Sequence, residues 1–443
     1  MRTLALLCVI ALPASAQDVL DPQGPAEPRG HDVVRNPRTG DCVVAWISGS
    51  GTSRTVTARR YGSNAQWSDA VTVDSFAGTV QEISIACGLV SETDERYLVV
   101  WRDTRGGADE IYGRVLDRAL APVGSSFRVS DFGDSGADAA PDAAWNRDRW
   151  LVVWAHTNPV QEIGRSQFSR HFEVNDDIAG RFVTTSGMAA GSFRITDEAI
   201  DTKNPAVAAQ GDAFFAAWQE HPGPQRPPRI WGAPIAMNGT VGLVAPYGTG
   251  TGANQVRPRL ATRPDGSAML VWSVQTADER TGALSSTAVG TRRVQGDGQY
   301  AAPAQALDYG ARGTPSIIFF PERGQYLVVY EVVSSVSPSI DVKGRFIDAQ
   351  TGELKSIVKL LNYGDLDERA PRVAAQPNGQ PLTVAQRGQT GENRELVVGY
   401  SGDDAKNNDN GNQSLCGFGA GAVNVPWGLV LLALLSIGGV CRR

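Results

Sequence analysis

The sequence predicts an all-β protein: a seven-bladed β-propeller built from four-stranded antiparallel blades. Three observations support this prediction. An apolar run that ends in an aromatic residue recurs at intervals of 53 to 64 residues, and each copy has further strand-like segments before and after it. Between residues 17 and 402 the chain shows no convincing helical period. Four strands in each of seven repeated units are typical of a propeller.

The recurring apolar run is the predicted second strand of each blade. Its form is clearest at Leu98–Trp101, which is apolar throughout and not alternating. This pattern is expected for a sheet that neighbouring blades cover on both faces. We therefore expect the aromatic anchors to fill the core between blades and not to form a ligand platform. The anchors are Trp46, Trp101, Trp154, Trp218, Trp272 and Tyr330, with Ala385 in a degenerate seventh copy.

Strand-like segments lie on both sides of each anchor. In the fifth copy the first segment, Pro258–Ala261, is joined to the apolar run by residues 263–266, whose Arg-Pro-Asp-Gly sequence suits a hairpin turn. In the second copy Ile111–Val115 and Phe127–Ser130 follow as third and fourth segments. The last copy shows only three, so we expect Asp18–Leu20 to supply the fourth. Such pairing closes the ring and removes two exposed sheet edges.

Two other architectures compete with the propeller. An elongated β-solenoid is disfavoured because its coils are typically ~20 to 30 residues, about half the period seen here. A chain of separate two-sheet sandwiches is disfavoured because a unit of this period buries too little surface alone.

Both ends of the chain are expected to be targeting segments. Residues 1–16 combine a positive start, an apolar stretch and a small-residue cleavage site, as in a signal peptide. Residues 403–415 have almost no apolar content and are predicted to be a disordered linker. The final segment, 416–443, contains an uncharged run at 422–441 that is long enough to span the membrane as a helix, followed by two arginines that favour the cytoplasmic side.

The final segment resembles a known kind of bacterial sorting signal. Cys416-Gly417, one apolar helix and a terminal basic pair are together similar to the MYXO-CTERM, GlyGly-CTERM and PEP-CTERM classes. The resemblance implies export, cleavage near Cys416 by a sorting protease, and retention at the cell surface. It also implies membrane contact through the helix before processing. The alternative is a simple single-pass tail with an incidental cysteine.

The repeat itself also resembles a known sequence. Tyr97–Arg105, followed by Asp109–Val115, is similar to a repeat common in predicted secreted bacterial proteins: a Val-Val-Trp strand, an Asp-x-Arg turn, then Ile-Tyr-Gly. Only the second copy matches well, and the "Asp-box" of sialidases occurs nowhere in the sequence. The resemblance covers residues 31 to 400 in outline. It implies a propeller-like surface protein and assigns no catalytic residue.

Composition and motifs exclude several functions. With 41 basic and 47 acidic residues the chain has no cationic field, so nucleic acid is not an expected partner. The four histidines show no ligand spacing, and we expect no resident metal or other cofactor. The sequence has no Gly-x-Ser-x-Gly elbow, Walker loop or dinucleotide fingerprint. Among 47 carboxylates, no pattern picks out a catalytic pair.

Cys42 and Cys87 are the only cysteines in the predicted ring. They fall near the same turn in adjacent copies, and an exported protein meets an oxidising compartment. A disulfide between them is therefore a candidate, and two separately buried thiols are the alternative.

An insertion between Ala155 and Asp177 distinguishes the third copy. It mixes basic and aromatic residues and is a candidate recognition loop. Its named residues are Arg165, Phe168, Arg170, His171 and Phe172. Strand alternation places it on the same rim as acidic links between copies, of which Asp131, Asp134 and Asp138 are weak candidates for calcium. The alternative is that these are ordinary solvated loops.

These features predict an exported, surface-retained propeller that acts as a binding or scaffold module for a glycan or protein ligand. One alternative is an envelope polysaccharide hydrolase or lyase with its active site at the propeller axis. Another is a structural surface-layer component. Converging carboxylates and exposed aromatics at the axis would favour the enzyme. A plugged axis with a prominent insertion would favour binding.

Overall fold

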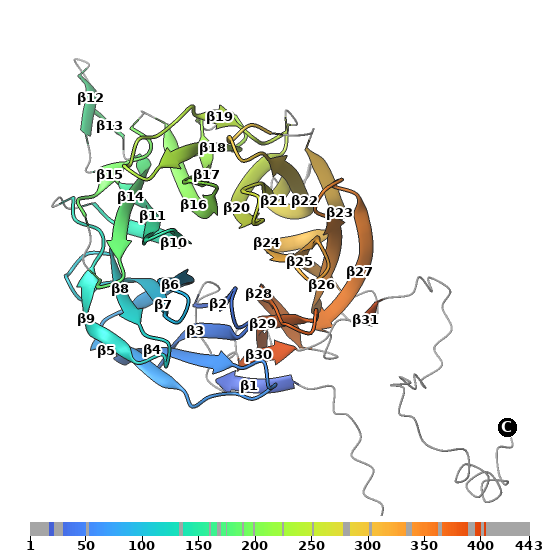
Figure 1. The fold of residues 1–443 in the computed structure, drawn as a ribbon. Helices are drawn as coiled ribbons and strands as arrows, with labels where there is room; N and C mark the ends of the chain where they lie inside the picture. The colour runs from blue at the N-terminus through green and yellow to red at the C-terminus, as the bar shows by residue number, and fades with distance from the viewer. Residues whose placement is uncertain are drawn as a thin grey trace, which may run out of the picture. The chain divides into compact units, whose positions relative to one another are not determined.

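The computed structural model is a ring of antiparallel sheets around a central axis, and it confirms the seven-bladed propeller (Figure 1). Each blade is a sheet whose first strand lies nearest the axis. The structure describes residues 17–21, 30–49, 53–132, 136–158, 161–165, 170–173, 175–187, 190–197, 200–223, 226–249, 252–277, 284–300, 304–333, 339–361, 366–388, 395–399 and 403–404.

The strands follow one another outward in the first four blades, except that blade three carries an inserted hairpin. Blade one comprises β2 (His31–Arg35), β3 (Cys42–Ser48), β4 (Ser53–Tyr61) and β5 (Val71–Ala77). Blade two comprises β6 (Val80–Leu89), β7 (Glu95–Asp103), β8 (Glu110–Leu116) and β9 (Pro122–Arg128). Blade three comprises β10 (Asp138–Asn146), β11 (Arg149–Thr157), β14 (Asp176–Thr184) and β15 (Phe193–Arg194). Blade four comprises β16 (Asp201–Gln210), β17 (Ala213–His221), β18 (Arg229–Ala236) and β19 (Ala245–Pro246).

The last three blades keep this plan, with additions at two outer edges. Blade five comprises β20 (Asn254–Thr262), β21 (Ala268–Ala277), β22 (Leu284–Val294) and β23 (Gln305–Tyr309). Blade six comprises β24 (Ala311–Phe320), β25 (Gln325–Val333), β26 (Ile340–Asp348), β27 (Leu354–Leu361) and an added β31 (Asp403–Asp404). Blade seven comprises β28 (Asp367–Ala375), β29 (Pro381–Gly388), β30 (Glu395–Gly399) and, from the other end of the chain, β1 (Gln17–Asp21).

The anchors are core residues, as predicted. Trp46 is 4% exposed and the other five aromatic anchors are fully buried. The apolar side chains of successive blades pack together; Trp101 of blade two, for example, shares a cluster with Ile47 and Val56 of blade one. Because the second strands are covered on both faces, none of these rings is available to a ligand at the surface.

The ring closes as the sequence predicts. β1 pairs antiparallel with β30, with Val19 opposite Val397. The indole N–H of Trp46 donates to Asp21 at 3.0 Å, so the N-terminal strand is also tied to blade one. The first and last blades are thereby joined through a strand from each end of the propeller.

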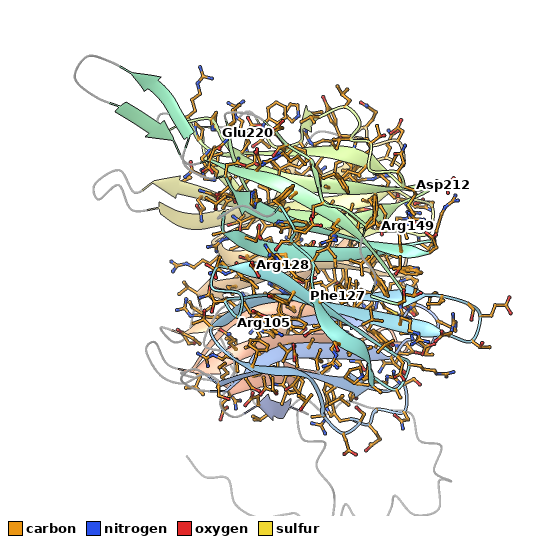
Figure 2. The ribbon with its side chains drawn as sticks, turned by 90° about the vertical axis from the view of Figure 1, so that its left-hand side faces the viewer. Arg105, Phe127, Arg128, Arg149, Asp212 and Glu220 are labelled. Atoms are coloured by element: carbon orange, nitrogen blue, oxygen red, sulfur yellow. The ribbon has the colours of Figure 1, made fainter. Side chains whose placement is uncertain are left out.

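Two features extend beyond the common plan. The insertion of blade three forms a hairpin, β12 (Gln161–Arg165) and β13 (Arg170–Glu173), which projects from the body of the ring (Figures 1 and 2). Asp403 and Asp404, which the sequence assigns to a disordered linker, instead pair with Lys359 and Val358 at the outer edge of β27. An outermost strand offers unpaired N–H and C=O groups, which explains why this short segment is ordered there.

Both predicted targeting segments lie outside the described residues. These are the signal peptide at 1–16 and the sorting segment at 416–443, with Cys416 and Gly417. In the portion of the chain that is described, no helix has the length and hydropathy needed to cross a membrane.

Candidate functional site: the axial channel

A β-bulge interrupts the first strand of blades two to seven. The register of pairing with the second strand shifts there, for example between Gln81 and Ile83 in β6. One residue at each bulge has a positive φ, between 46° and 71°. Each bulge thereby re-aims the residues that follow it. The positive-φ residues are Glu82, Ala140, Asn204, Arg257, Gly313 and Ala370.

The first strand of each of the seven blades carries one residue at an equivalent position in the strand register, near the axis. Each pairs with the residue that directly precedes an anchor; Asp142, for example, lies opposite Val153. The seven are Asp32, Ser84, Asp142, Ala206, Arg259, Ser316 and Arg372. All but Ala206 line one axial cavity of about 150 Å³. We call these six polar residues the waist of the channel.

Asp32 is held by groups from the two adjacent blades. The backbone N–H of Ile85 in blade two donates to its Oδ2 at 3.1 Å. On the other side, Arg372 Nε of blade seven lies 3.6 Å from Oδ1. Desolvation inside the channel raises the pKa of Asp32, although the Arg372 charge opposes the rise, and the negative charge of Asp142 raises it further.

Asp142 is set in a more strongly donating environment. It accepts the backbone N–H of Val207 at 2.8 Å and the hydroxyl of Ser84 at 3.1 Å. Desolvation raises the pKa of Asp142 as well, while the charge of Arg259 and these hydrogen bonds favour the ionised form. The waist thus combines two carboxylates with two arginines.

The channel widens on the side of the turns between first and second strands. This second cavity, which we call the mouth, has a volume of about 520 Å³. In five of the blades, the residue that follows the waist position contributes to the lining of both cavities. The waist and the mouth are therefore continuous. The five residues are Ile85, Ala143, Val207, Leu260 and Ile317.

The candidate recognition residues lie away from the axis. Arg165, Arg170, His171 and Phe172 belong to the projecting hairpin, in which Arg165 pairs with Arg170. Phe168 lies outside the described residues. The hairpin is therefore a separate feature from the axial channel.

The weak calcium candidates do not form a site in the described part of the chain. Asp131 pairs with Arg181 at 2.9 Å, and the buried Asp138 lies 2.8 Å from Nδ1 of His156. Asp134 is outside the described residues. Among those that are described, no group of three or more His, Cys, Asp or Glu side chains is arranged to hold a metal ion.

The candidate disulfide is not formed, because the two thiols lie on different sides of blade one. Cys42 belongs to the cluster shared by blades seven and one, whereas Cys87 packs against the cluster shared by blades one and two. Both cysteines are free. Burial raises the pKa of each thiol to about 12, so both are un-ionised at neutral pH.

Sequence reasoning missed the waist, although a signal was present. When the repeats are aligned on their anchors, the first strands carry a polar or charged residue at the same position in six of the seven copies. Reading the seven positions as a ring, instead of judging 47 carboxylates one by one, would have selected Asp32 and Asp142.

Comparisons with known proteins identify no family. No protein-family model matches the sequence, and no curated protein matches it. Among solved structures, the NanB sialidase from Streptococcus pneumoniae has a TM-score of 0.43 at 8% identity over 84% of this chain and 68% of its own. An α-L-arabinanase from Penicillium chrysogenum has a TM-score of 0.43 at 12% identity, over 72% of this chain and 93% of its own.

A further solved structure has no function attached. A protein of unknown function from Dyadobacter fermentans has a TM-score of 0.43 at 10% identity over 87% of this chain and 98% of its own. Since all three TM-scores are below 0.5, these likenesses carry no argument about what this chain does. The case for function depends on the axial channel itself.

Proposed function

We propose that this protein is a glycoside hydrolase whose active site is the waist of the axial channel. The observation that carries the proposal is the pair of carboxylates, Asp32 and Asp142, that line one cavity, where the charge of Asp142 raises the pKa of Asp32. Hydrolysis of a glycosidic bond requires two such carboxyl groups, one protonated and one ionised. The alternative named by the sequence thus has more support than the binding or scaffold interpretation.

The surroundings of the two carboxylates assign their roles. Desolvation raises the pKa of Asp142 as well, but Arg259, the Val207 N–H and the Ser84 hydroxyl favour its ionised form, so we assign it the role of general base. Asp32 is the general acid, because desolvation and the charge of Asp142 raise its pKa. Asp32 gives its proton to the leaving glycosidic oxygen as the C–O bond breaks. Asp142 takes a proton from the water whose oxygen bonds to the anomeric carbon, so that one water is consumed.

The test is sugar release from a panel of polysaccharides and simple glycosides by the chain that begins at Gln17. We expect Asp142→Asn and Asp32→Asn each to lower kcat by about 10²- to 10⁴-fold. The matched control is Asp212→Asn, on a side chain that is 84% exposed. The wild-type rate should fall as pH rises through the raised pKa of Asp32, since the acid then loses its proton. Absence of sugar release from the whole panel would contradict the proposal.

A binding function is the second candidate, and the projecting hairpin favours it. Arg165 on β12 and Arg170, His171 and Phe172 on β13 belong to a hairpin that extends beyond the blades (Figure 2). Retention of a glycan or protein on an array without turnover, lost when residues 161–173 are replaced by a short glycine linker, would support binding in place of hydrolysis. The array should be run with and without calcium.

Export and retention at the cell surface complete the proposal. They rest on the sequence of residues 1–16 and 416–443. Mass spectrometry of the C-terminal peptide, on protein recovered from its native envelope, would test whether the sorting segment is cleaved. An end near Cys416 is expected, and an intact terminal Arg443 would contradict processing.

A further inference from the structure

The mouth of the axial channel differs in character from the waist. Its inner wall is the aliphatic set that it shares with the waist, and alanines continue the wall outward along β10, β16 and β20. Its volume of about 520 Å³ is in the range of cavities that hold small organic ligands. An apolar chamber therefore opens directly from the cavity that contains the carboxylates.

Two of the side chains that line the mouth are aromatic, and each packs against another ring. Trp145 of blade three packs edge-on against Trp150, with ring centroids 4.6 Å apart. Phe319 of blade six packs against Tyr326 at 5.4 Å. Both Trp145 and Phe319 line the mouth and remain partly exposed, so they present fixed apolar surfaces to whatever enters it.

The charges that line the mouth are already compensated. Arg35 forms an ion pair with Glu322. Arg263 pairs with Asp265 at 3.1 Å and donates to the carbonyl of Ala349. An anionic ligand would have to displace these partners, whereas an uncharged apolar group would not. The mouth therefore favours a neutral apolar occupant.

We infer that the substrates are glycosides with an apolar aglycone, an alkyl or aryl group that occupies the mouth while the sugar lies at the waist. The inference rests on the proposed hydrolase function and names its substrate class. Such a molecule presents hydroxyl groups to the polar waist and a continuous apolar surface to the mouth. Each methylene that enters the mouth should tighten binding about three- to fourfold until the cavity is filled.

The test measures binding and cleavage separately. Methyl, butyl, hexyl and octyl glucosides and galactosides, kept below their micelle concentrations, compete with the uncharged fluorescent dye N-phenyl-1-naphthylamine on the chain that begins at Gln17. Ala209→Trp fills the mouth from a partly exposed position, three residues beyond Ala206 on β16. Ala119→Trp, on an exposed turn, is the control. We expect affinity to rise with chain length in wild type and control, and Ala209→Trp to abolish this dependence.

The outcomes distinguish the two proposals. Affinity that does not depend on chain length, or a dependence that survives in Ala209→Trp, would overturn the inference. Chain-length-dependent binding, with no cleavage of these glycosides and no sugar release from the polysaccharide panel, would support the mouth as an apolar binding site and contradict the hydrolase. Cleavage of sugars at a rate that ignores the aglycone would support the hydrolase and contradict the aglycone site.

Discussion

His31 is a fully buried imidazole on the innermost strand of blade one. It lies opposite Trp46, at the position that Ile83 occupies opposite Trp101 in blade two. Burial lowers the pKa of His31 from 6.5 to about 3, and the nearby charge of Arg372 acts in the same direction. The side chain is therefore neutral in the folded protein at any pH near neutrality.

This neutral histidine gives a prediction about acid stability. The unfolded chain binds a proton near pH 6.5, whereas the folded chain does so only near pH 3. The contribution of neutral His31 to the free energy of unfolding is therefore fully present above pH 6.5. It is lost as the pH falls toward 3, at roughly 1 kcal/mol per pH unit. His31→Ile introduces the residue type found at the equivalent position, Ile83, in blade two. In this variant the part of the pH dependence of the free energy of unfolding that is due to His31 should disappear. Urea unfolding at pH 7, 6 and 5 measures it, and equal slopes in both proteins would contradict the prediction.

The third strands repeat a glycine for a packing reason. Gly290 of β22 lies opposite Trp272, and a Cβ there would lie 2.3 Å from an indole carbon. In β26, a Cβ on Gly344 would meet the side chain of Leu327 at 2.8 Å. The large side chains of the second strand thus lie against the backbone of the third, which requires the absence of a side chain.

Gly290→Ala should consequently destabilise the propeller by about 1–3 kcal/mol, since the indole is enclosed and cannot move aside freely. Gly191→Ala is the matched control, because a Cβ there meets nothing within 4 Å. The measurement is the free energy of unfolding in urea for both variants. A loss of equal size in the two would show that glycine replacement as such, and not contact with Trp272, is responsible.

The elements show what a sequence can and cannot predict here. The anchors and the third-strand glycines recur in the sequence because each blade buries the same positions, so the strands were predictable. The bulges were not predictable: Glu82, Ala140 and Arg257 adopt positive φ, but none of them is a glycine, the residue type that favours this conformation. Without the bulge in β10, the inward direction of Asp142 could not be read from the sequence. Asp32 lies on a first strand without a bulge, and its convergence with a residue 110 positions away depends on ring closure.

At the scale of the whole molecule, stability depends on the pairing of β1 with β30, which joins the two ends of the propeller and which we call the seam. Blade seven supplies three strands from its own sequence, and β1 supplies the fourth. Without β1, strand β30 would be an open edge of unpaired backbone groups, and Trp46 would lose its hydrogen bond to Asp21. β2, which carries Asp32, contacts β28, the first strand of blade seven, so closure of the ring also maintains the waist.

Deletion of residues 17–21 should therefore lower the free energy of unfolding by roughly 2 to 5 kcal/mol, about 1 for each hydrogen-bonded position lost. The exposed edge of β30 should also promote self-association, visible by light scattering after size-exclusion chromatography. The matched control deletes Asp403 and Asp404, which pair at the outer edge of blade six and do not join the ends. Because the two deletions remove short edge strands in different places, a selective effect of the first would identify ring closure, and not edge pairing in general, as what stabilises the fold. If both deletions lower the free energy of unfolding equally, loss of edge pairing, and not loss of ring closure, would account for the effect.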